Sequence, residues 1–222
     1  MRQFGGMQRP QKLIFLAALT MVAAGLISIG LVLFLYSGDL PNIERLARFA
    51  PGAPTVVSDP CLASSPTALP SRQLGLLVQE AIEAAEPPDS ESSQISRSLL
   101  CDRRRTNLRF ALDAIRLDWQ IRLHFSKGEI RTIFANRAYF GLGIVGVENA
   151  SMRLFDKHTD QLDLAEAATL VGVIRAPERD SPLQNASGAL LRRNRVLEAM
   201  VTTGKLAADA AAKAEAEPVP TK

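Results

Sequence analysis

Apolar residues are concentrated in one uninterrupted run near the amino terminus. Residues 13–36 (LIFLAALTMVAAGLISIGLVLFLY) carry no charged side chain over 24 positions. A membrane-spanning helix needs roughly 20 apolar residues, whereas a helix on a soluble core keeps a polar stripe. The run therefore predicts a transmembrane helix. The alternative is a cleaved signal peptide, but its apolar core is usually about 7–15 residues long, and Tyr36-Ser37-Gly38-Asp39 is a poor cleavage site.

The charges beside this run predict which way it crosses the membrane. Arg2, Arg9 and Lys12 precede it with no acidic residue among them, and Asp39 follows it. Basic residues next to a transmembrane helix favour the cytoplasmic side. We therefore expect a cytoplasmic tail over residues 1–12 and export of the rest of the chain after the helix.

The exported part contains two cysteines, Cys61 and Cys101. Disulfides persist in oxidising compartments, so a bond between these residues is permitted there. The sequence leaves a disulfide and two buried thiols open as alternatives, because it does not fix the distance between them. Two cysteines are too few for a disulfide-rich scaffold or a four-cysteine zinc site.

The exported part has the pattern of amphipathic helices, with apolar residues three and four positions apart. Ser126–Glu129 and Asp163–Glu166 also match the capping box that starts a helix. No segment alternates apolar and polar residues as a half-buried strand does, so the sequence predicts a mainly α fold. The expected helices cover residues 69–86, 104–125, 127–135, 147–155, 163–174 and 188–203. The apolar stripe of the second of these helices consists of Leu108, Leu112, Ile115, Trp119 and Leu123.

Segments without this spacing are expected to connect the helices. They are a linker over residues 37–68, a polar loop over 87–98 and a glycine-rich loop over 136–147. Serine, proline and glycine favour turns and loops, which is the reason for these assignments. The Ala-rich tail over residues 205–222 has the composition to form one more helix before it frays.

Composition and missing motifs narrow the function classes. The chain has 222 residues and a net charge of only +3, and its dense basic run, Arg103–Arg105, has no interleaved aromatic residues, so a nucleic-acid interface is not indicated. The motifs of serine hydrolases, P-loop enzymes and zinc peptidases are absent from the sequence. Neither Ser-x-x-Lys nor Lys-Thr-Gly occurs, which argues against a transpeptidase site. We interpret His124 and His158 as ordinary surface or hydrogen-bonded residues.

Residues 126–183 contain two ordered sets of motif residues. One has the form Lys-x-Glu-Ile, then Asn-x-x-Tyr-Phe-Gly-x-Gly-x-x-Gly, and the other Leu-x-Glu-Ala-x-Leu-x-Gly, then Pro and Ser-Pro. They resemble the fourth and fifth motifs of the peptidoglycan glycosyltransferase (transglycosylase) domain, glycosyltransferase family 51, found in class A penicillin-binding proteins and monofunctional transglycosylases. The matching positions are Lys127, Glu129, Ile130, Asn136, Tyr139, Phe140, Gly141, Gly143, Gly146, Val147, Ala150, Leu164, Glu166, Ala167, Leu170, Gly172, Pro177, Ser181 and Pro182.

The resemblance implies a lysozyme-like, glycosyltransferase-type helical domain over residues 69–204, behind the transmembrane helix of a bacterial inner-membrane protein whose bulk is periplasmic. It implies lipid II or the nascent glycan strand as ligand, other cell-wall synthesis proteins as partners, and Mg²⁺ as the cofactor that relatives commonly use. The implied substrate-binding residues are Lys127, Asn136, Tyr139, Gly141, Gly143, Gly146 and Arg97.

The first three motifs of the family are degenerate or truncated in this chain. The glutamate of the first motif, presumed to be the general base, falls on Glu86, but Pro87 replaces the aspartate that follows it. Several tens of residues that normally come next are missing, and only Ser93–Leu99 resembles the second motif. The Arg, Lys and Glu of the third motif fall on Phe110, Ala111 and Ala114.

Arg109 and Asp113 offer a substitute for the lost third motif only with a shift of one residue. Each residue turns an α-helix by about 100°, so such a shift re-aims both side chains. Asp113 is therefore a second catalytic candidate beside Glu86. The alternative is a surface pair of Arg109 and Asp113, worth a few tenths of a kcal/mol.

Three hypotheses for the function follow. The first is a membrane-anchored relative of the glycosyltransferases that has impaired or no catalysis and a binding or regulatory role. The second is an active, divergent peptidoglycan glycosyltransferase, a hexosyltransferase that polymerises lipid II with Glu86 as base and Arg97 or Arg103–Arg105 on the pyrophosphate. The third is a non-functional remnant left by an internal deletion.

Overall fold

The computed structural model describes residues 9–36, 40–50, 74–87, 89–100 and 107–219. Contacts divide the chain into two compact units, Met1–Leu40 and Pro41–Lys222. The described residues form helices and a single isolated bridge between Tyr139 and Val145, which confirms the mainly α prediction. Cys61, Cys101 and Arg103–Arg105 lie outside the described residues.

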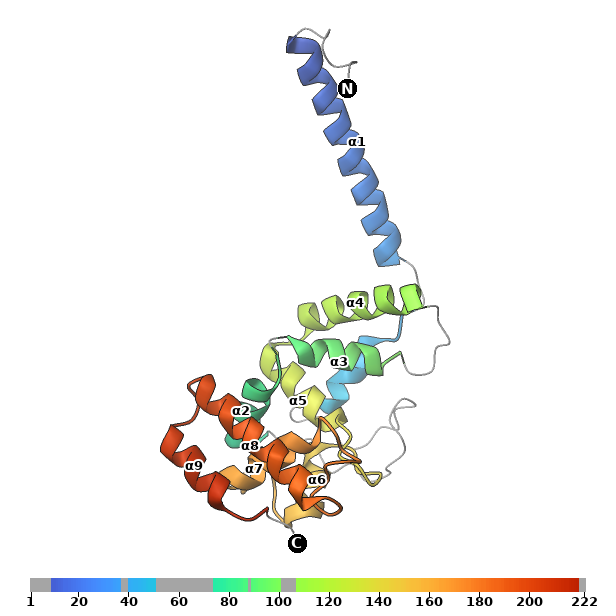
Figure 1. The fold of residues 1–222 in the computed structure, drawn as a ribbon. Coiled ribbons are helices and arrows are strands. Elements are labelled where there is room, and N and C mark those ends of the chain that lie inside the picture. Colours follow the sequence, from blue (N-terminus) through green and yellow to red (C-terminus); the bar gives the residue numbers. More distant parts are fainter. Residues whose placement is uncertain (1–8, 37–39, 51–73, 88, 101–106, 220–222) are drawn as a thin grey trace. The chain divides into compact units, whose positions relative to one another are not determined.

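Figure 1 shows the described helices with their labels in chain order. Their bounds are α1 (Arg9–Tyr36), the 3-10 helix η1 (Ile43–Phe49), α2 (Leu76–Ala85), α3 (Ser90–Ser98), α4 (Asn107–His124), α5 (Lys127–Arg137), α6 (Val147–Phe155), α7 (Leu164–Val173), α8 (Ala186–Thr202) and α9 (Ala208–Ala216).

Helix α1 contains the apolar run. Its segment Lys12–Val32 is long and apolar enough to cross a membrane, with a mean hydropathy of 2.4. The hydroxyl groups of Thr20 and Ser28 donate hydrogen bonds of 2.8 Å to carbonyl oxygens of the preceding turn. Both polar groups are therefore satisfied within the helix, as a lipid environment requires.

Helix α7 forms the centre of the second unit. All its residues from Ala165 to Val173 are buried, and it packs against α2, α6, α8 and α9. At Gly172 a Cβ atom would lie only 3.0 Å from the backbone and Cβ of Arg192, so the missing side chain lets α7 and α8 approach closely. A second group of elements, α3, α4, α5 and η1, packs together beside this core.

The local capping signals correctly predicted two of the helix starts. Ser126 and Glu129 form a complete capping box at the start of α5, and Asp163 and Glu166 form another at the start of α7. Each box satisfies backbone N–H groups that have no partner within the helix. The predicted helices over 147–155 and 188–203 correspond to α6 and α8.

Helix α2 is shorter than its apolar spacing suggested. It begins at Leu76, and Leu74 and Gly75 precede it; residues 69–73 lie outside the described part. Gly75 stands at the N-cap, where an added Cβ would lie 2.1 Å from the carbonyl oxygen of Thr159. The backbones at Gly75 and Thr159 therefore lie in close contact, and this contact fixes where the chain enters α2.

The prediction of a loop over residues 87–98 is wrong for its larger part, because Ser90–Ser98 form helix α3. Ser92, Ile95 and Ser96 are buried, and α3 packs against α4 and α5. The Ser92 hydroxyl donates a hydrogen bond of 2.6 Å to Asp118 of α4. Tertiary packing and hydroxyl hydrogen bonds thus outweigh the weak helix propensity of serine.

Helix α4 has its apolar stripe on the outside. Its inward face is formed instead by Asp113, Ala114, Arg116, Leu117 and Ile121, all of them buried. The predicted stripe remains exposed, with exposed fractions of 73% for Leu108, 44% for Leu112, 60% for Ile115, 50% for Trp119 and 68% for Leu123.

Helix α9 is held to the core by a buried cation. Arg193 of α8 has no exposed surface, and its guanidinium donates hydrogen bonds of 2.8 Å to the carbonyl oxygens of Glu215 and Glu217. A third contact, of 3.3 Å, reaches the carbonyl of Pro218. Burial lowers the pKa of Arg193, which the nearby carboxylates of Glu217 and Glu215 oppose. The side chain thus caps the carboxyl end of α9.

We predict that Arg193→Met lowers the free energy of unfolding by about 1–3 kcal/mol, because it removes the donors that bind the carbonyl oxygens at the end of α9. Chemical denaturation of the full-length chain followed by circular dichroism measures this change. The matched control is Arg195→Met on the exposed side of the same helix, expected to change stability by no more than about 0.5 kcal/mol. Equal losses in both variants would contradict the capping role.

Candidate functional site

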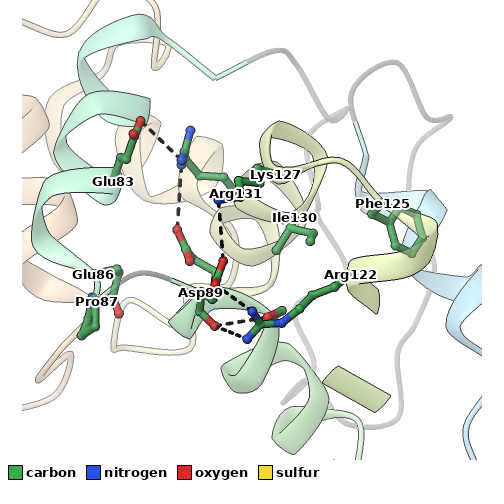
Figure 2. A pocket seen from close by; sticks show the side chains of 11 residues that line it. Glu83, Glu86, Pro87, Asp89, Arg122, Phe125, Lys127, Ile130 and Arg131 are labelled. Atoms are coloured by element: carbon green, nitrogen blue, oxygen red, sulfur yellow. Dashed lines mark hydrogen bonds and ion pairs between the residues drawn. The ribbon is translucent and has the colours of Figure 1, made fainter. Parts of the chain in front are cut away.

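Helices α2, α3, α4 and α5 surround a cavity of about 420 Å³ (Figure 2). It brings together two residues that the family resemblance singled out, Glu86 and Lys127. The complete lining consists of Glu83, Glu86, Pro87, Asp89, Glu91, Ser92, Arg122, Phe125, Lys127, Ile130 and Arg131.

Glu86, the candidate general base, is fixed by donors from two other parts of the fold. It ends α2, and its side chain is 3% exposed. Arg175, which follows α7, places its Nε 2.9 Å from Oε1 and donates from its second nitrogen to Oε2 at 3.0 Å. Ser90 and Gln94 of α3 donate to Oε2 at 3.0 and 2.8 Å. Both carboxylate oxygens are therefore engaged inside the protein.

The guanidinium of Arg122 is likewise engaged by neighbouring acceptors. Its Nε lies 2.9 Å from Asp118 Oδ2 and its Nη1 lies 2.9 Å from Asp89 Oδ2. Its Nη2 also donates to the backbone oxygen of Asp89 at 3.0 Å. Arg122 thus connects α4 to the α2–α3 turn instead of pointing a free charge into the cavity.

Arg131 and Lys127 are the other two cations of the cavity. Arg131 is largely buried and lies 3.4 Å from Glu83 and 3.9 Å from Glu91, as the dashed lines in Figure 2 show. Lys127, at the first turn of α5, is 87% exposed and lies 4.0 Å from Asp89. Lys127 is therefore the least engaged of these cations.

The charge balance of the cavity favours cations over anions. Four carboxylates, Glu83, Glu86, Asp89 and Glu91, face three cations, Arg122, Lys127 and Arg131. Burial raises the pKa of Glu91, whereas the hydrogen bond from Lys205 lowers the pKa of Glu83. A pyrophosphate entering this space would meet at least as much negative as positive charge.

The glycine-rich loop has the close turns that its sequence suggested. Gly141, Gly143 and Gly146 all have positive φ angles. A Cβ atom on Gly141 would lie 2.3 Å from the carbonyl oxygen of Pro177, so the loop and the turn after α7 are in backbone contact. Gly146 is the N-cap of α6, while no heavy atom lies within 4 Å of a Cβ placed on Gly143.

A second cavity, of about 380 Å³, lies beside this loop. Tyr139 lines it together with Arg137, Gln94 and Ser98. The Tyr139 hydroxyl contacts the carboxylate of Glu178 and accepts a hydrogen bond from Gly143 N at 3.2 Å. Gln94 connects the two cavities, because it also donates to Glu86. Tyr139 therefore lines a different space from Glu86 and Lys127, and Gly141, Gly143 and Gly146 line neither cavity.

The remaining predicted site residues lie outside both cavities. Asn136 donates from its side chain to the carbonyl oxygen of Phe49 at 2.9 Å and so holds η1 against α5. Arg97 is exposed on α3. Asp113 is buried on the inward face of α4, 3.7 Å from Arg116, which differs from the surface pair with Arg109 that we considered. None of these three lines either cavity.

Sequence reasoning missed several residues that define the main cavity. Arg175 lies 89 positions from Glu86, and only the packing of α2 against α7 brings them together. Nothing in the sequence distinguishes Arg122 and Arg131 from ordinary exposed residues of a helix. The one local signal was the pair Ser90 and Gln94, one and two turns after Glu86 in a segment that we expected to be a loop.

Divalent-cation binding by this chain's own side chains has no support in the geometry. Among the described residues no group of three histidine, cysteine, aspartate or glutamate side chains could hold a metal ion. The cavity carboxylates are directed at arginines instead. Mg²⁺ therefore stays a prediction from the family resemblance, and no step below depends on it.

The comparisons with known proteins decide the family. Residues 92–201 match the family model for transglycosylases. This segment, just under half of the chain, belongs to the transglycosylase family. Lys127, Asn136, Tyr139 and the glycine-rich loop lie inside the matched segment, whereas Glu86 lies before it. The roles of these residues in substrate binding and catalysis stay predictions.

Known relatives match this chain over part of their length. Penicillin-binding protein 1A of Aquifex aeolicus is 34% identical over 131 residues, which are 59% of this chain and 18% of that protein. A Cupriavidus necator protein named as a transglycosylase is 30% identical over 124 residues, which are 56% of this chain and 53% of its own length. The chain thus spans about half of the second relative and less than a fifth of the first.

One solved structure is similar to this chain, at lower sequence identity than the two relatives above. Penicillin-binding protein 1A of Haemophilus influenzae matches with a TM-score of 0.44 and 20% identity. The match covers 68% of this chain and 18% of that protein.

We predict that Glu86 and Arg175 stabilise the fold as a coupled pair. Glu86→Gln and Arg175→Met should each lower the free energy of unfolding, and the double variant should lose less than the sum, with a coupling of about 1–2 kcal/mol. Denaturant unfolding of the four proteins measures this cycle. The control pairs Glu86→Gln with Arg97→Met, since Arg97 is exposed, and should be additive. Additivity in both cycles would contradict the pairing.

Proposed function

We propose that this transglycosylase-family chain is a membrane-anchored protein of cell-wall synthesis with impaired or no catalysis, acting as a binding or regulatory partner. The observation that carries the proposal is the internal pairing of the charges that surround Glu86. The family match supports the connection to peptidoglycan synthesis.

Lipid II polymerisation sets the chemical requirements. A sugar moves from a lipid pyrophosphate to an acceptor hydroxyl, so a base must take the hydroxyl proton while positive charge stabilises the departing pyrophosphate. General base catalysis contributes roughly 10²–10⁴-fold, and one preorganised stabilising group contributes about 10²–10³-fold. A site that lacks both functions loses most of its rate.

The position of Glu86 is unfavourable for a base. Its Oε2 accepts hydrogen bonds from Arg175, Ser90 and Gln94, and its Oε1 is paired with Arg175, so the carboxylate is held by the fold rather than left free for an acceptor hydroxyl. A buried carboxylate that loses its partners pays a large desolvation cost. These contacts support a structural role for Glu86.

The cations of the cavity are equally unfavourable for a pyrophosphate. Arg122 is paired with Asp89 and Asp118, and Arg131 lies between Glu83 and Glu91. A phosphate that contacts either cation would therefore lie beside the carboxylates that already neutralise it. These ion pairs support the proposal that the cavity no longer stabilises a departing pyrophosphate.

The apolar helix α1 supports attachment to a membrane. Its length and composition fit a single crossing, and the basic residues before it favour a cytoplasmic amino terminus and a periplasmic second unit. We propose the bacterial inner membrane as its location, because peptidoglycan synthesis takes place at its outer surface.

The retained scaffold supports a binding role. The glycine-rich loop keeps the backbone turns of the family motif, and Tyr139 lines an open cavity beside it. The sugars of a nascent glycan strand and the surface of another cell-wall synthesis protein carry no pyrophosphate, so the acidic cavity does not oppose their binding. We propose these as its partners.

Polymerisation of lipid II by the purified full-length chain, with magnesium and with Glu86→Gln as control, tests the proposal. We expect no glycan polymer from either protein when circular dichroism confirms helical folding. When either protein is added to an active peptidoglycan glycosyltransferase, we expect both to change its rate equally.

Polymer made by the unaltered chain and lost in Glu86→Gln would contradict the proposal. It would instead establish the alternative, an active and divergent glycosyltransferase with Glu86 as base. Polymer made by both proteins would contradict the proposal and also the assignment of Glu86.

A further inference from the structure

The second cavity, of about 380 Å³, differs from the main cavity in the kind of side chain that lines it. It lies within the second unit, between the carboxyl-terminal turns of α3 and α5, the glycine-rich loop and the turn after α7. Most of its lining is apolar, and the polar members are Gln94, Ser98, Arg137 and Tyr139. Pockets that bind small molecules have this composition, with apolar walls and a few polar groups that orient the ligand.

The charge of the second cavity is opposite to that of the main cavity. Its lining contains the cation Arg137 and, among the described residues, no acidic side chain, whereas four carboxylates line the main cavity. Two carboxylates approach this lining from outside, and other groups bind both of them. Glu86 is paired with Arg175, and Glu178 contacts the Tyr139 hydroxyl. The lining of the second cavity therefore favours an anionic group.

Arg137 is held in place by two neutral neighbours. It is buried at the end of α5, and its Nη2 donates to the Ser98 hydroxyl oxygen at 3.2 Å. Its guanidinium lies 5.1 Å from the centroid of the Phe49 ring. A guanidinium carries five N–H donors in a rigid plane, so it can bind Ser98 and a carboxylate at the same time. A side chain fixed in this way loses little further freedom when a ligand binds.

The apolar walls limit what can accompany the carboxylate. Ile95, Phe134 and Val145 are buried, and Ile174 and Pro177 complete the walls together with Ala138. A second charge or a polar chain would lose its hydration against these walls and find few partners there. The cavity thus favours a ligand with one carboxylate on a small apolar body.

We propose that the second cavity binds such a carboxylate through Arg137. Its source is either the carboxyl terminus of a peptide with small apolar residues or a free short-chain carboxylic acid. This inference rests on the proposed binding role of the chain and gives a chemical class to one of its ligands.

Isothermal titration calorimetry of the full-length chain in detergent tests the proposal with three probes. They are acetyl-alanyl-alanine, the same dipeptide with an amidated carboxyl terminus, and butyrate. We expect saturable binding of the acid dipeptide and at least about tenfold weaker binding of the amide, because the amide lacks the charge that pairs with the guanidinium. Tighter binding of the acid dipeptide than of butyrate identifies a peptide terminus as the ligand, and equal binding identifies a free carboxylic acid.

Two substitutions of Ser98 locate the site while Arg137 stays in place. Ser98→Asp puts a carboxylate of the protein beside the guanidinium, where it competes with the ligand. Ser98→Asn has nearly the same shape without the charge and is the matched control. We expect Ser98→Asp to weaken binding of acetyl-alanyl-alanine at least about tenfold and Ser98→Asn about threefold or less. Denaturant unfolding should show that Ser98→Asp is no less stable than Ser98→Asn, because the new carboxylate pairs with Arg137.

Three results would overturn the carboxylate site. They are no saturable binding of either acid, equal binding of the acid dipeptide and its amide, and equal loss of binding in the two Ser98 variants. The lipid II assay tests the proposed function separately. A chain that polymerises lipid II and binds the acid dipeptide contradicts the proposed loss of catalysis alone. A chain that makes no polymer and binds neither acid contradicts the carboxylate site alone.

Discussion

The buried carboxylate of Glu86 is the contact on which the arrangement of the second unit depends. It joins the end of α2 to α3 through Ser90 and Gln94, and to the segment after α7 through Arg175. A carboxylate with this little exposure is stable only when it is paired and hydrogen-bonded. The same contacts that hold the helices together therefore occupy the group that the family resemblance makes the candidate base.

A single feature of the sequence explains why Glu86 holds helices together instead of being free to act as a base. Only three residues separate Glu86 from the start of α3 at Ser90, whereas the family resemblance leads us to expect several tens of residues here. The short connection places the α3 donors directly on the carboxylate and brings Asp89 to Arg122. The short connection thus accounts for the closed pairs around Glu86 and Arg122.

Local signals in the sequence predicted much of the fold. Capping boxes at Ser126 and Asp163 and the apolar spacing of α6 and α8 were sufficient, because these interactions act within a few residues. Helix α3 was missed because its stability comes from buried contacts with α4 and α5. The direction of the α4 stripe was also not predictable, since apolar spacing shows that one face differs from the other but not which one is covered.

The candidate site was predictable only in part. Glu86 and Lys127 were found by family resemblance and line one cavity. The arginines of this site were not found, because Arg175 is distant from Glu86 in the sequence and Arg122 and Arg131 belong to no recognised motif. Conversely, Asn136 matched a family motif and holds η1 in place. Motif residues identify a scaffold, whereas the chemistry depends on which charges face each other after folding.

The most direct measurement is a titration of the full-length chain with inorganic pyrophosphate, followed by the Nε–Hε signals of its arginines in nuclear magnetic resonance. Signals are assigned with the variants Arg122→Lys, Arg131→Lys and Arg175→Lys. If the cavity charges are satisfied internally, these three signals stay unchanged while signals of exposed arginines shift weakly. Saturable shifts of Arg122 and Arg131 would contradict the account, because they would mean that the cavity still accepts the leaving group of the family's reaction.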